Sequence, residues 1–328
     1  MMNNNVDIHL RHAQLRAEFV RNIPFQALAD QFDRQLQRRR AVQSLELVEE
    51  ARGIAVVGAP GSGKSKLVRR VLTQNPNLVQ PKAGDETIEF ISILVPSPAT
   101  VKDLGSILLE KLGYLSERKG ASAGDIWRQV RTLLQNRKTL FVHLDEAQHL
   151  IASQNKNVRE GVVDVLKTLM NSDVWPVGLI LSGTPKMVEM LNADVQLGRR
   201  VDMVKLPPIS WASQAKEVRA ILLTYLKKAS LEKCDDLDLD DVLQRLVHAG
   251  ANEFGLTIQM LLFALEEALL GGTDRLALSH FAEAFRRKSG CIPALNIFLC
   301  SDYLNVDARE ALWSQSSKFG GIAAHNGK

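Results

Sequence analysis

The sequence of 328 residues has little cysteine, and its cysteines form no recognisable pattern. Cys234, Cys291 and Cys300 are too few and too widely spaced for a zinc or iron–sulfur site, and an odd number cannot pair completely. This argues against a disulfide framework. We expect three small buried side chains in a reducing compartment.

The sequence also lacks a long apolar run and a secretory signal. The longest apolar helix pattern, residues 260–270, is interrupted by Glu266 and Glu267, and it is shorter than the ~18 residues of a membrane span. Residues 1–9 are polar and contain no apolar stretch of signal-peptide type. We therefore expect a cytoplasmic protein without a membrane partner.

A strong charge of one sign is absent as well. The net charge of +4, from 41 basic and 37 acidic residues, is too small to indicate nucleic-acid binding by itself, although it leaves room for a local basic surface. A content of 45% hydrophobic and 24% charged residues is ordinary for a globular protein. The length allows about two domains.

Short apolar stretches alternate with helical patterns through the first two thirds of the chain. After a helical segment of mixed charge, residues 1–50, the expected strands are 54–57, 88–95, 139–144, 178–181 and 201–206. The helical patterns between them are 101–112, 126–135, 158–170 and 187–191. Strands that are apolar throughout are typical of a parallel sheet covered on both faces. The alternation predicts an α/β domain over residues 51–208.

Only helical patterns follow Pro207 and Pro208. They cover residues 212–228, 239–249, 256–270 and 279–288. We expect a small all-α domain over residues 209–288, and then a tail, 289–328, with a Gly-rich polar end. The tail is expected either to dock a partner or to pack on the helical domain, with its end disordered.

A glycine-rich loop between the first strand and the next helical pattern fits the phosphate-binding consensus at every fixed position. It consists of Gly58, Ala59, Pro60, Gly61, Ser62, Gly63, Lys64 and Ser65, and Lys66 opens the following helix. The glycines let backbone N–H groups turn toward phosphate oxygens, and the helix start adds partial positive charge. Lys64 would reach the β- and γ-phosphates of ATP, and Ser65 would bind Mg²⁺.

Two carboxylates, Asp145 and Glu146, follow the apolar strand that ends at Leu144. Asp145 can hold Mg²⁺, and Glu146 can orient or deprotonate the attacking water. Their position 81 residues after Lys64, with one expected strand between the two motifs, makes the pattern specific. His143 alternates into the sheet, and we interpret it as a satisfied core histidine.

Two further polar groups complete the candidate catalytic set. Ser182 and Thr184 end a buried strand, and a hydroxyl there can position the lytic water and sense the γ-phosphate; an ordinary turn is the alternative. Arg199 and Arg200 precede the last strand, from which an arginine would reach the nucleotide of a neighbouring subunit; a solvated basic pair is the alternative.

The order of these motifs resembles the AAA+ ATPase superfamily over residues 35–290. Within it the chain is similar to the TniB/TnsC-type ATPases of transposons, which are related in role to MuB. The resemblance depends on the phosphate loop, on Leu144-Asp145-Glu146-Ala147-Gln148-His149-Leu150, on Ser182-Gly183-Thr184-Pro185, and on Pro96-Ser97-Pro98-Ala99-Thr100 ahead of a helix that ends at Gly113. It implies a P-loop domain with a five-stranded parallel sheet and a helical lid.

The resemblance also implies a bacterial regulator of transposition. Such proteins bind ATP, assemble as rings or filaments on double-stranded DNA, and pass the target to a transposase, and hydrolysis disassembles them. Expected partners are duplex DNA, further copies of the chain, the transposase and a targeting adaptor. The residues expected to face DNA phosphates are Thr100, Lys102, Lys119, Ser122 and Lys156. Each has an ordinary surface role as its alternative. Arg34 and Arg38–Arg40 are interpreted as a solvated or nucleotide-proximal helix face.

One departure from the family pattern concerns the lid. Many AAA+ lids have an arginine that reaches back to the γ-phosphate, but the matching stretch here, residues 255–259, contains none. We therefore expect slow turnover that suits a switch. The competing readings are a replication initiator or helicase loader, a secretion or pilus ATPase that binds no DNA, and a scaffold that does not hydrolyse ATP.

Overall fold

The structure is a computed structural model that describes residues 2–82, 86–114, 120–235 and 237–313. Its contacts divide the chain into two units. An α/β unit contains residues 21–60 and 64–206, and a helical unit contains residues 1–20, 61–63 and 207–328. The expected N-terminal segment, residues 1–50, is therefore divided between the two units after residue 20.

The α/β unit contains five parallel strands in the order β2-β3-β4-β1-β5. The strands are β1 (Gly53–Gly58), β2 (Phe90–Leu94), β3 (Phe141–Asp145), β4 (Gly178–Gly183) and β5 (Val201–Leu206). The helices are α2 (Ile23–Ser44), α3 (Lys64–Gln74), α4 (Val101–Lys111), α5 (Ala123–Asn136), α6 (Lys156–Met170), α7 (Lys186–Ala193) and α8 (Val195–Gly198), with a 3-10 helix, η1 (Ala147–Ile151). The predicted α/β class and parallel five-stranded sheet are confirmed.

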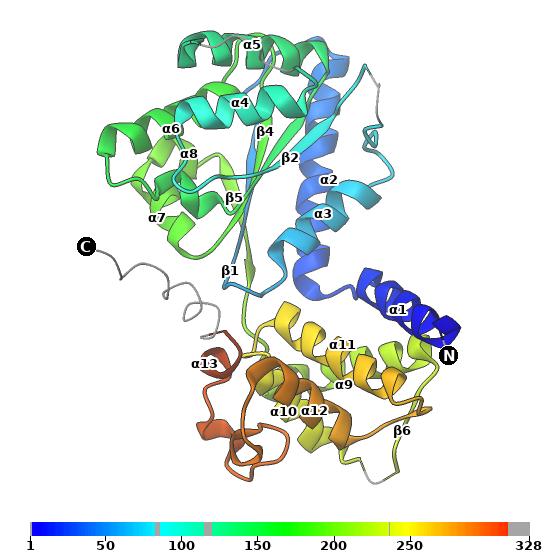
Figure 1. Cartoon of the computed structure of the whole chain (residues 1–328). Coiled ribbons are helices and arrows are strands. Elements are labelled where there is room, and N and C mark those ends of the chain that lie inside the picture. The colour runs from blue at the N-terminus through cyan, green and yellow to red at the C-terminus, as the bar shows by residue number, and fades with distance from the viewer. Residues whose placement is uncertain (1, 83–85, 115–119, 236, 314–328) are drawn as a thin grey trace, which may run out of the picture. The chain divides into compact units, whose positions relative to one another are not determined.

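Helices cover both faces of this sheet (Figure 1), and its inner strands β1, β3 and β4 are buried along almost their whole length, whereas the edge strand β5 exposes Asp202 and Lys205. Alternate strand residues such as Val57, Leu144 and Leu181 join a core with α4 to α8. On the opposite face the Phe32 ring of α2 lies 4.9 Å, between centroids, from the Phe141 ring of β3. The alternation of side chains along each strand thus gives two apolar layers.

The helical unit contains α1 (Met2–Ala17), α9 (Trp211–Ala229), α10 (Leu239–Ala249), α11 (Phe254–Leu270), α12 (Leu278–Ser289) and α13 (Ala308–Trp313). It also has two 3-10 turns, η2 (Pro293–Leu295) and η3 (Tyr303–Asn305), and a short parallel pair, β6 (Glu232–Lys233) with β7 (Arg275–Leu276). The predicted helical character is confirmed. Two-residue strands are too short to give a pattern in the sequence.

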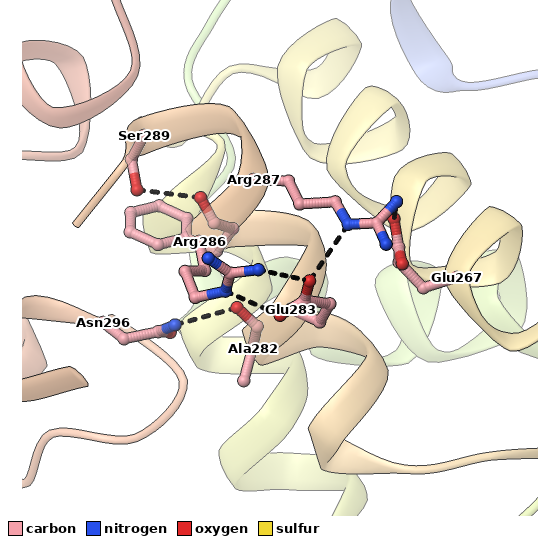
Figure 2. A network of polar contacts seen from close by, with 8 residues as sticks. Glu267, Ala282, Glu283, Arg286, Arg287, Ser289 and Asn296 are labelled. Atoms are coloured by element: carbon pink, nitrogen blue, oxygen red, sulfur yellow. Dashed lines mark hydrogen bonds and ion pairs between the residues drawn. The ribbon is translucent and has the colours of Figure 1, made fainter. Parts of the chain in front are cut away.

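Ion pairs join α11 to α12 at the surface of this unit (Figure 2). Glu283 accepts two hydrogen bonds from Arg286, both 2.7 Å, and one from Arg287 at 3.0 Å. Arg286 and Arg287 lower the pKa of Glu283 to about 2. Arg287 also pairs with Glu267 of α11 at 3.1 Å, so one carboxylate and one guanidinium connect the two helices.

The chain after α12 packs onto the helical unit over its described part. Ile297 and Phe298 are buried, and the Phe298 ring lies 5.4 Å from the Phe281 ring of α12. Of the two roles expected for the tail, residues 296–308 have the second, because they pack on the helical unit. The end expected to be disordered lies largely in 314–328, outside the described residues. Within the described part of the chain, no helix is both long and apolar enough to span a membrane.

Candidate active site

The glycine-rich loop joins β1 to α3, as its sequence context predicts. Gly61 and Gly63 have φ angles of +83° and +96°, a left-handed conformation that strains any L side chain. Lys64 begins α3 and is only 5% exposed, and its Nζ donates to the Ala59 carbonyl at 2.9 Å. The lysine therefore lies along the loop, where a phosphate group would rest.

Two further features of the loop fit a bound phosphate. The Ser62 hydroxyl is buried, and none of the described residues makes a hydrogen bond with it. The first turn of α3 contains no acidic residue, so no carboxylate of that turn neutralises the positive end of the helix dipole. Ser65 is half-buried in the same turn, and Lys66 is exposed. The residues present thus fit a nucleoside triphosphate.

The strand register brings the polar strand ends to one edge of the sheet. Asp145 of β3 lies opposite Ser182 of β4, and Ser182 lies opposite Val56 of β1. β4 is the strand between the loop strand β1 and the carboxylate strand β3. The carboxylates and the phosphate loop therefore leave the sheet at the same edge.

A chain of hydrogen bonds holds Asp145 in place. The fully buried Ser182 hydroxyl donates to Asp145 Oδ1 at 2.5 Å, and the Glu146 N–H donates to the same oxygen at 3.1 Å. His143 Nε2 lies 2.8 Å from Ser182 Oγ, and its Nδ1 lies 2.8 Å from Ser92 Oγ. Since the single Ser182 proton goes to Asp145, Nε2–H donates to Ser182 and Nδ1 accepts from Ser92.

His143 is neutral in this chain. Burial lowers its pKa to about 4, against an opposing effect of the nearby Asp145 charge. Both ring nitrogens have hydroxyl partners, so the interpretation of His143 as a satisfied core histidine is confirmed. The Ser182 hydroxyl faces Asp145 rather than open solvent.

A different set of contacts holds Glu146. It has φ 57° and ψ 41°, a left-handed conformation that is uncommon for a residue with a side chain. Gln148 of η1 donates from Nε2 to Glu146 Oε2, and its Oε1 accepts from the Thr184 N–H at 3.0 Å. Sequence reasoning missed Gln148, although it lies in the stretch, residues 144–150, that carries the family resemblance.

The two arginines before β5 have different surroundings. Arg200 is 5% exposed, pairs with Glu50 Oε2 at 2.8 Å and donates to the Gln196 carbonyl at 2.9 Å. The Arg200 hydrogen bond lowers the pKa of Glu50. Arg199 is exposed, and no ion pair or side-chain hydrogen bond to it is found among the described residues. Arg199 is therefore the member of the pair that can reach another molecule.

Four of the five residues expected to face DNA lie at the starts of α4, α5 and α6. Trp127 Nε1 donates to the Val101 carbonyl at 2.8 Å, which brings the starts of α4 and α5 together. A Cβ added to Gly161, in α6, would lie 3.3 Å from Val101 Cγ2. Thr100, Lys102, Ser122 and Lys156 occupy or precede these starts.

The two hydroxyl residues in this group act as helix caps. Thr100 Oγ1 accepts from the Asp103 N–H at 3.1 Å, and Ser122 Oγ accepts from the Asp125 N–H at 3.2 Å. Each hydroxyl also donates to the same aspartate. Lys102 is exposed, Lys156 pairs with Glu160 at 3.5 Å, and Lys119 lies outside the described residues.

The interpretation of the basic helix face is wrong at one position. Arg39 of α2 is buried and donates to the Pro176 carbonyl at 2.5 Å, and burial lowers its pKa. Its neighbours differ: Arg40 pairs with Glu89 at 2.6 Å, and Arg38 is exposed. A long side chain can bury its stem and hydrogen-bond a carbonyl, which composition does not reveal.

The arrangement is similar to that of solved ORC proteins. The ORC2 protein of Aeropyrum pernix, in ADPNP–ADP complexes, matches with a TM-score of 0.56 and 17% identity over 79% of this chain and 66% of that chain. The ORC1 protein of Aeropyrum pernix, in complex with DNA, matches with a TM-score of 0.53 and 18% identity over 90% and 79%. The chain thus has the AAA+ fold, and it spans slightly less than two thirds of the ORC2 chain.

The family of the chain follows from its sequence. A family model described as bacterial TniB protein matches residues 25–211, more than half of the 328 residues, and the chain belongs to this family. No curated protein matches the chain. The matched range includes the phosphate loop, both carboxylates and the arginine pair.

Proposed function

We propose that the chain binds ATP with Mg²⁺ and hydrolyses it. The observation that carries the proposal is the register that aligns Asp145 with Ser182, and Ser182 with the strand leading into the phosphate loop. The loop N–H groups and Lys64 bind the phosphates, and Ser65 and Asp145 hold Mg²⁺. Mg²⁺ commonly needs only one or two protein ligands besides phosphate oxygens and water. No group of three or more His, Cys, Asp or Glu side chains that could hold a metal occurs in the described ranges.

The remaining polar groups receive roles that follow from their contacts. Glu146 activates the attacking water, and Ser182 orients Asp145 through the hydroxyl that it donates. Thr184, at the end of β4, senses the γ-phosphate. Arg199 reaches the nucleotide of a neighbouring subunit, and Arg200 fixes the segment that carries it.

Nucleotide binding and hydrolysis are tested separately with two substitutions. Lys64→Ala should abolish the binding of a fluorescent ATP analogue. Glu146→Gln should keep that binding and lower phosphate release about 100-fold or more, the usual contribution of a general base. Lys111→Ala, at the far end of α4, is the control for a lysine substitution. An unchanged release rate in Glu146→Gln would remove Glu146 from the chemistry and favour a scaffold.

We further propose that the ATP-bound protein assembles on duplex DNA, marks a transposition target and recruits a transposase. The TniB family and the gathering of candidate residues at the starts of α4, α5 and α6 support this function. Helix starts favour phosphate through their N–H groups. Asp103 and Asp125 weaken that attraction at two of the starts, so Lys102 and Lys156 carry most of the proposed contact.

Filter binding to duplex DNA, with and without a non-hydrolysable ATP analogue, tests this proposal. We expect retention that needs the analogue and shows no sequence preference. Lys102→Ala with Lys156→Ala should weaken binding and reduce the salt dependence by about two released counterions. Lys111→Ala, on the same helix as Lys102, should leave both quantities unchanged. Retention that does not depend on the nucleotide would contradict the proposal, and no retention of DNA under either condition would favour the secretion-type ATPase.

A replication initiator is the second candidate, because the fold likeness includes a DNA-bound ORC1 protein. Such a protein usually has a winged helix with a recognition helix. In the described residues after α12, 290–313, we find only η2, η3 and the six-residue α13. Binding that prefers one origin-like sequence over random duplexes would favour the initiator.

We also propose slow turnover, since α11 has no arginine at residues 255–259 to reach the γ-phosphate. Slow hydrolysis would keep the ATP-bound assembly on DNA long enough to be recognised. A DNA-stimulated rate well above the ~10 per second of a median enzyme would refute this point.

A further inference from the structure

Gln148 connects the Glu146 carboxylate with the end of β4. Its amide lies in η1, two residues after Glu146, and contacts both Glu146 Oε2 and the backbone N–H of Thr184. The groups that it joins come from the turn after β3 and from the end of the neighbouring strand. Each is a proposed participant in hydrolysis.

The orientation of this amide follows from its partners. The Thr184 N–H can only donate, so the group 3.0 Å away must be the acceptor oxygen Oε1. The amide nitrogen then faces Glu146 and donates to its carboxylate oxygen Oε2. One side chain therefore makes two hydrogen bonds of fixed direction, and reversing the amide would break both.

The surrounding backbone is adapted to this contact. A Cβ added to Gly183 would lie 2.7 Å from Gln148 Oε1 and 3.3 Å from its backbone nitrogen, so glycine provides the space that the amide occupies. Glu146 itself has the left-handed conformation already described, directly after the end of β3. Strained residues of this kind are enriched at functional sites.

We propose that Gln148 is a positioning residue: it holds the Glu146 carboxylate in the orientation for water activation and couples that orientation to Thr184. The inference rests on the proposed hydrolysis of ATP. A residue that acts through Glu146 should change the rate of the chemical step and not the affinity for ATP. A residue that only closes the η1 turn should change stability or nothing.

The test is steady-state phosphate release by the full chain with duplex DNA and saturating Mg²⁺. Gln148→Ala should lower kcat at least about tenfold, because small misplacements of a catalytic group are costly, and leave the KM for ATP within about twofold. Gln148→Glu keeps the acceptor for the Thr184 N–H but loses the donor to Glu146, so it should lower kcat as well. Gln135→Ala, an exposed glutamine of α5, is the matched control.

A double-mutant cycle separates positioning from structure. In the Glu146→Gln background, adding Gln148→Ala should lower the residual rate by less than about twofold, because the group that it positions is already disabled. A further loss as large as that in the wild-type background would overturn the proposal. So would a wild-type kcat for Gln148→Glu, which folds with the Thr184 contact retained.

The outcomes also distinguish this proposal from the proposed function. If Glu146→Gln hydrolyses ATP at the wild-type rate, both fall together. If Glu146→Gln is impaired while Gln148→Ala and Gln148→Glu are not, hydrolysis by Glu146 stands and only the role of Gln148 is refuted.

Discussion

Alanine substitution of Arg199 and Arg200 should separate catalysis from stability. Arg200→Ala removes the ion pair between the buried Arg200 side chain and the exposed Glu50, and a hydrogen bond to the Gln196 carbonyl. Hydrogen bonds to charged groups contribute about 1.5–3 kcal/mol each, but the half-exposed Glu50 regains water when its partner is lost. We expect Arg200→Ala to lower the free energy of unfolding by about 2–3 kcal/mol.

Arg199→Ala should behave in the opposite way. Its side chain is exposed, and surface substitutions of this kind usually change the free energy of unfolding by less than about 0.5 kcal/mol. An arginine that reaches a neighbouring nucleotide contributes on the order of 10³-fold or more to hydrolysis. We therefore expect a stable protein that binds ATP and assembles but releases phosphate at least about 10³ times more slowly.

Urea unfolding followed by circular dichroism measures the first effect, and phosphate release with duplex DNA measures the second. A mixing experiment tests whether Arg199 acts between subunits. Glu146→Gln and Arg199→Ala chains should each release phosphate very slowly alone. In a mixed assembly some sites combine an intact Glu146 with an intact Arg199, so activity should return in part. No recovery would refute action between subunits, and a stable but inactive Arg200→Ala would reverse the assignment of the pair.

Three further predictions concern the same unit. Arg200 lowers the folded-state pKa of Glu50, so the ion pair stabilises the fold above pH ~4.5, and this stabilisation is lost as the pH falls through the lowered pKa. Glu50→Gln should therefore lower the free energy of unfolding by about 1 kcal/mol at pH 7 and leave it unchanged in acid, as measured by urea unfolding. Burial lowers the pKa of His143 to about 4. Between pH ~6.5 and ~4 the unfolded chain binds a proton at His143 that the folded chain does not. The free energy of unfolding of the wild type should therefore fall by up to about 3 kcal/mol as the pH is lowered across this range, and thermal melts of His143→Gln should not show this loss. Gly183→Ala crowds Gln148 Oε1, and should cost about 1–3 kcal/mol in thermal melts and slow phosphate release as Gln148→Ala does; normal values would contradict the described packing.

The sequence predicts the sheet well, because each strand is a short apolar run between helical patterns. The expected strand 178–181 is within the observed β4, and the expected 201–206 matches β5. The inner strands β1, β3 and β4 are buried on both faces, so their sequences show an apolar run without polar alternation. The helical segment of residues 1–50 is less predictable, because no local signal shows that α1 packs on the helical unit and α2 on the sheet.

Site residues can be predicted from the sequence where the chemistry requires a fixed spacing between them. They are harder to predict where their role depends on which residues the fold places beside them. The phosphate loop and the carboxylates Asp145 and Glu146 follow from motif and strand order. The difference between Arg199 and Arg200 does not, since adjacent arginines look alike until Glu50 is placed beside one of them. Gln148 is missed for the same reason: its role depends on a left-handed turn after β3.

Asp145 and Glu146 are both held by contacts with the end of β4. Ser182 holds Asp145 through its side chain, and two residues later Thr184 holds Gln148, and thereby Glu146, through its backbone. β4 also pairs with β1, which continues into the phosphate loop. A shift of β4 relative to β3 would therefore disturb the proposed metal ligand, Asp145, and the proposed base, Glu146, together. Because packed strands move as rigid elements, we expect β4 to be the element that ties water activation to the state of the nucleotide.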